Sequence, residues 1–516
     1  MNFKLTIKKY WEEKPLLLIL LAGSFFRLLA VVFSKGFGFF DDHFLIIEAA
    51  QSWADGKDYN NWLPRSGATG PGGHNLFYTG IHYLFFAFCK LLHFNDPQGK
   101  MYVVRLLHAA FSLLIITLSY KITFLYAGKK AARMTGILLS LYWFMPMLSV
   151  RNLVEMVCIP FLLWTTLLIL RGGKEGRKNF FFLAGMSAGI AFAIRFQSLF
   201  FIGGFGLVLL FQKRWVGAFL FGAGTLLCAS ATQGLIDYKV WGYPFAEFYA
   251  YIQYNLANKY NFETQAWYMY FTVLFGLLIP PVSLFLLFGF IRKWKTHLLL
   301  FLPAVLFFAF HSYFPNKQER FILPVIPFVV IGGIIGWQEF VEHSGFWITR
   351  AKLLRGCWIF FWIVNTIPMI FISCSYSKRD RVEAMIYLSH KPDLRLFVVE
   401  ATNHDDFVMP PLYYLGHWPK TVLSMTSVIN CDSLNKYTRN NPDSLLPNYV
   451  LFQEEDRLDE RIQKFRDCYG DIQLETVIHQ GLLDAILHTL NPVNKSQNCY
   501  IYKITARRGE SHSPEK

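Results

Sequence analysis

Recurrent apolar runs constrain the fold of this chain more than any other feature of its sequence. Several of them have roughly 17–25 apolar residues, the length at which an α-helix crosses about 30 Å of hydrocarbon. The composition agrees, because 54% of the 516 residues are hydrophobic, only 16% are charged, and 52 are Phe. Soluble globular proteins do not combine these proportions. The sequence therefore predicts a polytopic α-helical membrane protein.

The chain has a net charge of +15, and its Lys and Arg residues stand in short clusters between the apolar runs. Cytoplasmic loops of membrane proteins collect Lys and Arg in this way. We therefore expect the lipid bilayer, and not nucleic acid, to be the partner that this charge reflects. The dense clusters are Lys129/Lys130/Arg133, Arg171/Lys174/Arg177/Lys178, Lys213/Arg214, Arg292/Lys293/Lys295 and Arg350/Lys352/Arg355.

All of these clusters fall on the cytoplasmic side if residues 75–92 form a helix that lies in the membrane interface. The topology then has about eleven transmembrane helices. The first, at 15–33, is a retained helix and not a signal peptide, because no small-residue cleavage site follows it. The others are 102–126, 134–150, 155–170, 180–194, 199–211, 215–233, 268–291, 297–310, 321–337 and 356–374.

An odd number of spans places the polar C-terminal part of the chain outside. Its predicted strands are 395–400, 448–453 and 499–504, with a polar helix at 456–469. The expected organisation is a transmembrane domain at 1–374 with a first outer loop at 34–101, a small mixed α/β extracytoplasmic domain at 375–506, and a disordered tail at 507–516.

The eight cysteines lack the spacing of a metal site. Several lie inside apolar runs, where Cys acts as a small hydrophobic residue. Only Cys431, Cys468 and Cys499 lie in the polar C-terminal region, which leaves room for one disulfide there.

Two adjacent carboxylates, Asp41 and Asp42, closely follow the first apolar run and precede His43. Neighbouring like charges repel, and the low dielectric of a membrane boundary amplifies the repulsion, so such a pair points to function. One alternative is a helix N-cap, since Asp is a preferred cap for the helix expected to begin near Phe44.

Other polar clusters share the outer side in this topology, and they contain Arg195, Asp237, Gln265, Trp267, Tyr268, His311, Lys317 and Arg320, with a weaker group at Arg151, Asn152 and Glu155. Ionisable groups near the membrane usually line a site or a polar cavity. Lys317 and Arg320 are three residues apart and would project to one side, so with Arg195 they would form an anion site suited to phosphate. The alternative for these cations is snorkelling to the headgroups. Trp267 and Tyr268 offer flat faces on which sugars stack, or they belong to an interfacial aromatic belt.

A carboxylate pair and a phosphate-binding basic site suggest transfer of a group from a phospholipid-linked donor. One Asp would deprotonate an acceptor hydroxyl while the basic residues neutralise the leaving phosphate. The sequence has no Walker motif, no His/Cys metal spacing and no Gly-x-Ser-x-Gly elbow, so no cofactor or metal is expected.

The segment His311-Ser312-x-x-Pro315-x-Lys317-x-x-Arg320-Phe321 resembles the His-Ser-x-x-Pro-His-Lys-Glu-x-Arg-Phe motif of a GT-C mannosyltransferase family. That family uses dolichyl-phosphate-mannose to build GPI anchors and N-glycan precursors. Asp41-Asp42-His43-Phe44 is similar to its His-Pro-Asp-Glu-His-Phe signature in the first lumenal loop. Residues 265–271 resemble its His-Pro-Trp-His-Trp-Tyr-Phe segment, and Asp237 precedes them as an Asp does in the family. The four matches run in family order and cover most of residues 15–340.

The chain departs from these motifs at Phe39, Phe40, Asp42, Gln265, Asn316 and Gln318, where the family has His, Pro, Glu, His, His and Glu. The Asp, Lys and Arg of the motifs remain, so the general chemistry is retained. The donor sugar and the acceptor stay open, and a bacterial relative that uses an undecaprenyl-phosphate-linked sugar fits as well.

The resemblance implies a hexosyltransferase that moves a hexose, with mannose first in line, from a polyprenyl-phosphate donor to a glycan or glycolipid hydroxyl with inversion. Asp41 would be the general base, and its neighbour Asp42 would either orient the acceptor or tune the basicity of Asp41. Lys317, Arg320, Arg195 and His311 would hold the donor phosphate, and His43, Asp237, Trp267, Tyr268 and Gln265 would contact the substrates. The membrane would be a bacterial inner membrane or the ER membrane, with the active site on the periplasmic or lumenal side.

Two alternatives belong to other classes of protein. A transporter or flippase of lipid-linked saccharides would place ionisable residues deep within its spans, whereas here they cluster at the outer ends. A non-catalytic scaffold whose outer domain binds a partner gives no reason for the carboxylate pair and the phosphate-type basic cluster.

Overall fold

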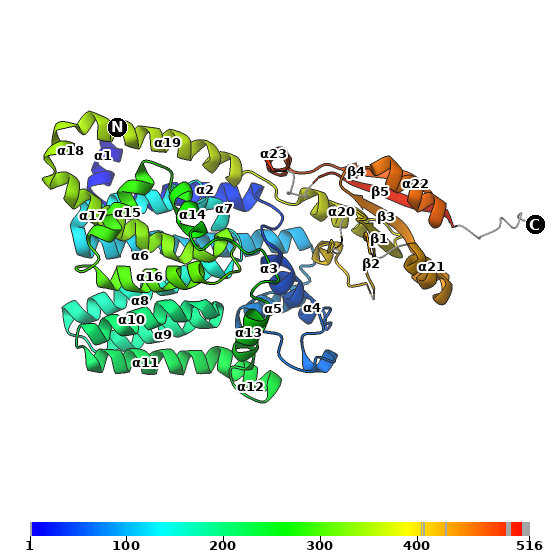
Figure 1. Cartoon of the computed structure of the whole chain (residues 1–516), viewed down its shortest axis with the longest axis horizontal. Helices are drawn as coiled ribbons and strands as arrows, with labels where there is room; N and C mark the ends of the chain where they lie inside the picture. The colour runs from blue at the N-terminus through cyan, green and yellow to red at the C-terminus, as the bar shows by residue number, and fades with distance from the viewer. Residues whose placement is uncertain are drawn as a thin grey trace, which may run out of the picture. The chain divides into compact units, whose positions relative to one another are not determined.

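The computed structural model describes residues 3–403, 405, 408–419, 421–428, 431–491 and 497–507 (Figure 1). Nearly all of the predicted tail at 507–516 lies outside these residues. The chain divides into two compact units. The transmembrane unit consists of Met1–Val32, Asn60–Leu84 and Tyr102–Cys374. The sheet unit consists of Phe33–Tyr59, Phe85–Met101 and Ser375–Lys516.

Helices make up the transmembrane unit. They are α1 (Phe3–Glu13), α2 (Pro15–Phe33), α7 (Met145–Leu148), α8 (Val154–Glu175), α9 (Asn179–Ile194), α10 (Leu199–Phe211), α11 (Trp215–Ala229), α12 (Leu235–Trp241), α13 (Ala246–Ala257), α14 (Met269–Leu277), α15 (Val282–Arg292), α16 (Leu298–Tyr313), α17 (Ile326–His343), α18 (Gly345–Thr349) and α19 (Ala351–Ser373). Two further helices, α5 (Leu76–Leu91) and α6 (Pro97–Leu141), contribute residues to both units.

Within the described residues, six helical segments are long and apolar enough to cross a membrane, and a bent pair makes a seventh if it counts as one span. Four shorter apolar helices accompany them. The predicted polytopic fold is therefore confirmed, and the first span, Pro15–Phe33, has the predicted bounds. By length alone the described helices reach six or seven of the roughly eleven predicted spans.

The segment predicted as one span at 268–291 is instead two helices, α14 and α15, bent by 118° at their junction. Pro280 and Pro281 stand in the break, and the preceding Ile279 has a left-handed φ of 57°. Proline lacks the N–H that would continue a helix and disfavours helical geometry at the residue before it. The apolar run is continuous in the sequence, and the two prolines divide it into two helices.

The helix α6 turns back on itself. Its 45 residues would span about 68 Å if straight, and they include Gly128 with a φ of 73° and a ψ of −169°. On either side of this glycine, Thr123 Oγ1 donates to Thr135 Oγ1 at 3.2 Å. Farther along, Arg27 of α2 bonds both Ser112 Oγ and the Ser140 carbonyl oxygen. The two arms therefore run antiparallel, as the separate predicted spans 102–126 and 134–150 require.

Close helix packing in this unit depends on glycine. A Cβ added at Gly289 of α15 would lie 2.1 Å from the carbonyl oxygen of Gly333 in α17. Small residues let transmembrane helices approach backbone to backbone. The same relation holds between α9 and α11, where a Cβ at Gly185 would lie 2.1 Å from the Phe221 carbonyl oxygen.

The sheet unit contains one five-stranded mixed sheet in the order β2-β1-β3-β5-β4. Its strands are β1 (Leu396–Glu400), β2 (Leu423–Met425), β3 (Pro447–Gln453), β4 (Gly470–Ile478) and β5 (Cys499–Arg507). The strand β1 pairs in parallel with β2 and β3, and β5 pairs antiparallel with β3 and β4. The three predicted strands are confirmed as β1, β3 and β5, while the two edge strands β2 and β4 were not predicted.

Helices of the sheet unit are α3 (Phe40–Asp42), α4 (Ala49–Ala54), α20 (Arg379–Ser389), α21 (Cys431–Asn440), α22 (Leu458–Cys468) and α23 (Leu482–Leu490). The predicted polar helix at 456–469 is confirmed as α22. Its Phe465 and the Leu434 of α21 pack in one core with Val450 and Phe452 of the central strand β3. A mixed α/β domain therefore follows the last span, as predicted.

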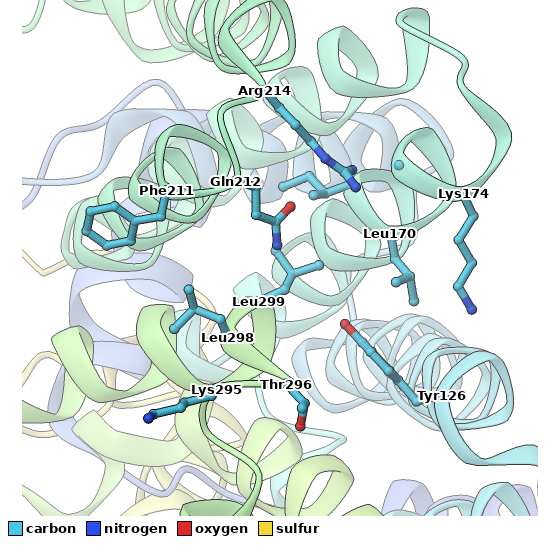
Figure 2. A pocket seen from close by; sticks show the side chains of 12 residues that line it. Tyr126, Leu170, Lys174, Phe211, Gln212, Arg214, Lys295, Thr296, Leu298 and Leu299 are labelled. Carbon is cyan, nitrogen blue, oxygen red and sulfur yellow. The ribbon is translucent and has the colours of Figure 1, made fainter.

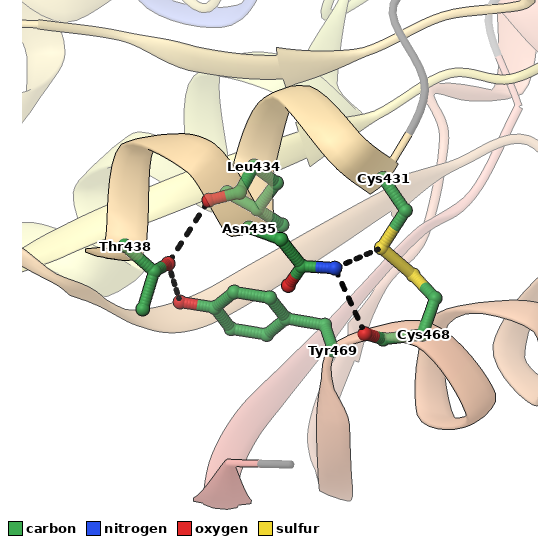
Figure 3. The surroundings of a disulfide bond; sticks show 6 residues. All are labelled: Cys431, Leu434, Asn435, Thr438, Cys468 and Tyr469. Carbon is green, nitrogen blue, oxygen red and sulfur yellow. Dashed lines mark hydrogen bonds between the residues drawn. A yellow bond between two sulfur atoms is a disulfide. The ribbon is translucent and has the colours of Figure 1, made fainter. Parts of the chain in front are cut away.

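A disulfide joins Cys431, at the start of α21, to Cys468, at the end of α22 (Figure 3). Asn435 Nδ2 donates to the Cys468 carbonyl oxygen at 3.3 Å, and Thr438 Oγ1 lies 3.1 Å from the Tyr469 hydroxyl. The bond and these contacts tie the two helices together beside the sheet. The single disulfide for which the sequence left room is thus formed, and Cys499 is free and buried.

Candidate active site

The carboxylate pair lies at the start of the short helix α3 in the sheet unit. Asp42 is only 2% exposed, and its Oδ1 accepts a hydrogen bond from the Phe39 backbone N–H at 3.0 Å. This bond reaches from the third position of α3 back to its N-cap, Phe39, and closes the turn. It is not the N-cap of a helix that begins near Phe44, which the sequence offered as the alternative role. Asp41 is half-buried, and its carboxylate is the more accessible of the two.

The ring of His43 is buried between two aromatic side chains. It stacks on Phe37 with ring centroids 4.6 Å apart and on Tyr414 with centroids 5.5 Å apart. Its Nε2 lies 3.3 Å from Oε1 of Glu48, which also accepts the Tyr413 backbone N–H at 2.9 Å. These contacts fix the residue beside the carboxylate pair. Sequence reasoning missed Glu48, although a lone carboxylate in the apolar run 44–50 was a visible signal.

In the transmembrane unit, the predicted phosphate-binding cations converge on two phenylalanine rings. The Arg195 guanidinium lies 5.4 Å from the Phe307 ring centroid and 5.8 Å from that of Phe321. The guanidinium carbon of Arg320 lies 5.5 Å from the ring centroid of Phe321. The ring centroids of His311 and Phe307 are 4.1 Å apart. Residues from three separate parts of the sequence therefore form one buried basic cluster.

Arg195 is held from several sides at the end of α9. Its Nη2 donates to the Phe321 carbonyl oxygen at 3.1 Å, and its Nη1 lies 3.6 Å from Oε1 of Glu155. Both charged side chains are almost fully buried. A buried cation with one carboxylate partner can still attract an anion, because each guanidinium has five N–H donors. Glu155 belonged to the weaker predicted cluster, and the structure joins it to the stronger one.

Lys317 lies in the loop between α16 and the 3₁₀-helix Glu319–Val325. Its Nζ donates to the Phe314 carbonyl oxygen, and burial lowers the pKa of its ammonium group. In the same cluster, His311 Nδ1 lies 2.8 Å from the Phe307 carbonyl oxygen. Its Nε2 is buried without a hydrogen-bond partner among the described residues. A buried polar atom in that state favours the presence of a ligand group beside it.

A two-stranded bridge brings the predicted aromatic segment to this loop. Thr264 pairs with Asn316 in an antiparallel bridge. Beside it, the Gln265 backbone N–H donates to the Pro315 carbonyl oxygen at 3.2 Å, and the Lys317 backbone N–H donates to the Glu263 carbonyl oxygen at 3.2 Å. The following residues Trp267 and Tyr268 are 66% and 54% exposed. They leave two uncovered aromatic faces next to the segment that meets the Lys317 loop.

Asp237 is buried in a hydrogen-bond network. Its carboxylate accepts from Gln233 Nε2 at 2.7 Å and from the Glu247 backbone N–H at 3.0 Å. The Glu247 carboxylate in turn accepts the backbone N–H groups of Gly73 and His74 at 2.7 and 2.8 Å, and burial raises the pKa of this carboxyl. Asp237 therefore positions Glu247, which anchors the Gly/Pro-rich loop 66–73. Glu247 was also missed by sequence reasoning, since an isolated Glu in an aromatic stretch carries no motif.

The predicted site residues are thus divided between the units. Asp41, Asp42 and His43 lie in the sheet unit, and the other predicted residues lie in the transmembrane unit. Across the described part of the chain, no three His, Cys, Asp or Glu side chains gather closely enough to hold a metal ion.

Comparison with solved structures defines the class of fold. ArnT from Cupriavidus metallidurans, solved with bound undecaprenyl phosphate, has a TM-score of 0.55 at 12% identity, covering 95% of this chain and 98% of ArnT. The oligosaccharyltransferase AglB from Archaeoglobus fulgidus, solved with an inhibitory peptide and a dolichol-phosphate, has a TM-score of 0.50 at 11% identity, covering 89% of this chain and 71% of AglB. The fold is that of a GT-C membrane glycosyltransferase.

Sequence comparison places the chain within that class. The profile of the Alg9-like mannosyltransferase family matches residues 17–400, which is most of the chain. The chain therefore belongs to the Alg9-like mannosyltransferase family, and it is a multi-pass membrane enzyme of GT-C type. No curated protein matches the sequence significantly. The predicted family resemblance is confirmed.

Proposed function

We propose that this enzyme transfers a hexose, with mannose as the first candidate, from a polyprenyl-phosphate-linked donor to a hydroxyl of a glycan or glycolipid, with inversion at the anomeric carbon. The observation that carries the proposal is the buried basic cluster around Phe307 and Phe321, which contains Arg195, Arg320 and His311. Basic side chains buried together suit a phosphate group that a lipid carries into the membrane boundary. The lipid phosphates bound to ArnT and AglB agree with a donor of this kind.

In the proposed reaction, the Asp41 carboxylate accepts the proton of the acceptor hydroxyl. The hydroxyl oxygen attacks the anomeric carbon and forms the new glycosidic bond. The bond from that carbon to the phosphate oxygen breaks, and its electron pair leaves with the polyprenyl phosphate. Lys317, Arg320 and Arg195 stabilise the charge that develops on the phosphate. Asp42 and His43 position Asp41 through the packing at α3.

For the acceptor and sugar, the exposed faces of Trp267 and Tyr268 offer stacking surfaces. Gln265 holds the segment that carries them, and Asp237 positions the loop 66–73 through Glu247. We assign residues 1–374 to catalysis and donor binding.

We place the active site on the periplasmic or lumenal side of the membrane. The disulfide Cys431–Cys468 supports this placement, because disulfides persist in oxidising compartments. The basic clusters support it as well, since they assign the opposite loops to the cytoplasm.

The decisive experiment compares transfer of radiolabelled sugar from polyprenyl-phosphate-mannose by wild-type membranes and by Asp41→Asn membranes at equal expression. Loss of the general base is expected to lower the rate by about 10²- to 10⁴-fold. Asp96→Asn is the matched control, because Asp96 is exposed, lies in the same unit and caps α6 through Gly99 N, a role that Asn also performs.

Wild-type transfer by the Asp41→Asn variant would remove Asp41 from the role of base and direct the same test to Asp42. If wild-type membranes do not transfer mannose, a panel of polyprenyl-phosphate sugars identifies the donor. Failure of every donor in the panel would contradict the proposed reaction.

A further inference from the structure

A second basic site lies in the transmembrane unit, away from the residues of the proposed reaction. A cavity of about 330 Å³ opens where the bend of α6 near Gly128 meets the ends of α8, α10, α11 and α16 and the adjoining loops (Figure 2). Its lining is Tyr126, Ile169, Leu170, Gly173, Lys174, Phe211, Gln212, Arg214, Lys295, Thr296, Leu298 and Leu299. These loops carry the basic clusters that the charge pattern assigns to the cytoplasm.

Three cations line this cavity: Lys174 in the last turn of α8, Arg214 directly before α11 and Lys295 shortly before α16. The described residues give none of them a carboxylate partner within ion-pair distance. Lys174 Nζ donates only to the Leu125 carbonyl oxygen, at 2.7 Å. Arg214 and Lys295 form no ion pair with the described residues. Two nearby cations outside the cavity are paired with carboxylates, Arg177 with Glu175 at 3.6 Å and Lys293 with Glu339 at 2.6 Å. The positive charge inside the cavity is therefore left for a ligand.

The shape of the cavity depends on Gly173. A Cβ at this position would lie 1.8 Å from Nη1 of Arg214, so the guanidinium rests directly against the glycine backbone. In Figure 2 the side chains of Arg214, Gln212 and Tyr126 point toward one another across the cavity. A guanidinium, an amide and a phenol together offer several hydrogen-bond donors to one anionic group.

The rest of the lining is apolar and includes Leu170, Phe211 and Leu299. A ligand for this cavity must combine an anionic head with an apolar body, and a volume of about 330 Å³ is in the usual range for a small-molecule site. Phosphate is the anionic head that a planar guanidinium recognises with paired hydrogen bonds. Basic pockets between transmembrane helices on the cytoplasmic side bind phospholipid headgroups by this chemistry.

We infer that this cavity binds the phosphate headgroup of an anionic membrane lipid from the cytoplasmic leaflet. Arg214 and Lys174 hold the phosphate, and the leucine and phenylalanine side chains receive the first part of the acyl chains. The bound lipid links four segments of the transmembrane unit: the bend of α6, the end of α8, the loop between α10 and α11, and the loop before α16. This site is independent of the donor site and of the proposed reaction.

The test measures lipid binding to the purified full-length protein by native mass spectrometry, with dioleoyl-phosphatidylglycerol as the anionic probe and dioleoyl-phosphatidylcholine as the neutral one. The wild type is expected to bind one phosphatidylglycerol more tightly than any phosphatidylcholine. Arg214→Gln is expected to weaken that first binding step by about tenfold, the effect of losing one charge-assisted hydrogen bond. Lys213→Gln is the matched control, because Lys213 is the adjacent exposed cation and does not line the cavity.

A second variant keeps every charge. Gly173→Leu places a side chain where the Arg214 guanidinium lies and fills the cavity. This variant is therefore also expected to lose the tight binding of the first phosphatidylglycerol. If Arg214→Gln also lowers the unfolding temperature, the Gly173→Leu variant is the one that tests lipid binding. Equal weakening by Lys213→Gln and Arg214→Gln, or unchanged binding in Gly173→Leu, would overturn the site. Displacement of the lipid by millimolar inorganic phosphate would assign the cavity to a soluble phosphate and overturn the lipid assignment.

Discussion

Arg195 has both a structural and a proposed chemical role, and the two can be separated. Its guanidinium is paired with Glu155 and also bonds the Phe321 carbonyl oxygen in the basic cluster. Removing one partner of a buried ion pair leaves an uncompensated charge, which costs about 3–5 kcal/mol. Removing both partners avoids that cost, although the phosphate would still lose a donor.

We therefore expect Arg195→Gln to lower both the unfolding temperature and sugar transfer. The double variant Glu155→Gln/Arg195→Gln should regain most of the unfolding temperature and remain inactive. Thermal unfolding and radiolabelled transfer, measured on the same preparations, check both statements. Transfer at the wild-type level in the double variant would show that Arg195 only balances Glu155.

Asp380 in α20 gives the sheet unit a pH-dependent stability. Burial raises the pKa of this carboxyl from 3.8 to about 6. The folded state then holds the proton more tightly than the unfolded state, so stability is lost as pH rises from about 4 to about 6. The loss is on the order of 3 kcal/mol at neutral pH, because one pKa unit corresponds to about 1.4 kcal/mol.

Asp380→Asn mimics the protonated carboxyl. The variant should unfold at a higher temperature than the wild type at pH 8 and at the same temperature at pH 4, as measured by thermal unfolding of the full chain. Asp459→Asn, at an exposed position of α22, should show no such pH-dependent gain. A gain of equal size at both pH values would mean that Asp380 stays ionised in the folded protein.

The residues that sequence reasoning found are those with motif neighbours, such as Asp41, Lys317 and Arg320. Their convergence with Arg195 followed from placing their loops on one side of the membrane. Glu48 and Glu247 were missed because each acts on backbone N–H groups of a distant segment. Such contacts depend on tertiary structure, and no local spacing of residues in the sequence indicates them.

At the scale of elements, paired glycines determine how closely the helices pack. The helix α15 meets α17 at Gly289, where an added Cβ would lie 2.1 Å from the Gly333 carbonyl oxygen and 2.6 Å from the Trp337 backbone nitrogen. Neither backbone atom can move without shifting its helix. The same substitution elsewhere in the membrane meets open space, as at Gly206 of α10.

We expect Gly289→Ala to destabilise the protein by about 1–3 kcal/mol through overpacking. Gly206→Ala should be neutral or slightly stabilising, because alanine favours helix more than glycine does. Unfolding temperatures in the same detergent compare the two. Equal effects would show that helix propensity, and not close packing, governs Gly289.

Sequence periodicity predicted those elements whose own residues form a clear apolar pattern with distinct ends. The span 15–33 and the strands at β1, β3 and β5 combine apolar runs with clear boundaries. The strand β2 has three residues and exists because β1 pairs with it, while β4 is a half-exposed edge strand whose weak alternation was missed. The break in 268–291 depended on two prolines whose effect outweighed a continuous apolar run.

At the scale of the whole molecule, the helix α19 gives a direct test of membrane orientation. Cys357 lies near its start, beside the basic residues assigned to the cytoplasm, and the exposed Cys374 follows its end. A transmembrane helix of this length carries the two thiols to opposite faces of the membrane. Their accessibility therefore reports which side carries the sheet unit.

A membrane-impermeant maleimide, added to intact cells or sealed ER vesicles from the proper side, should label Cys374 and not Cys357. The label should disappear in Cys374→Ser and persist in Cys357→Ser. Cys431 and Cys468 should react only after reduction. Labelling that depends on Cys357 would reverse the proposed topology.

The division of the molecule into two units could not be obtained from composition. Segments 33–59 and 85–101 belong with the C-terminal sheet, although the sequence assigned them to a loop of the transmembrane domain. This assembly joins residues more than 350 positions apart, as in the bond from Tyr413 N to Glu48 at a separation of 365. No pattern within either segment indicates such a partner.

The packing around His43 also bears on how this enzyme differs from its relatives. The family profile ends at residue 400, yet the motif residue His43 stacks on Tyr414, which lies beyond that limit. A motif residue inside the profile and a tyrosine outside it thus share one structural neighbourhood. A chimera that keeps the first 400 residues and replaces the rest would leave every signature residue in place while giving this histidine new neighbours. Divergence among members can therefore reach the motif loop without altering a single motif position.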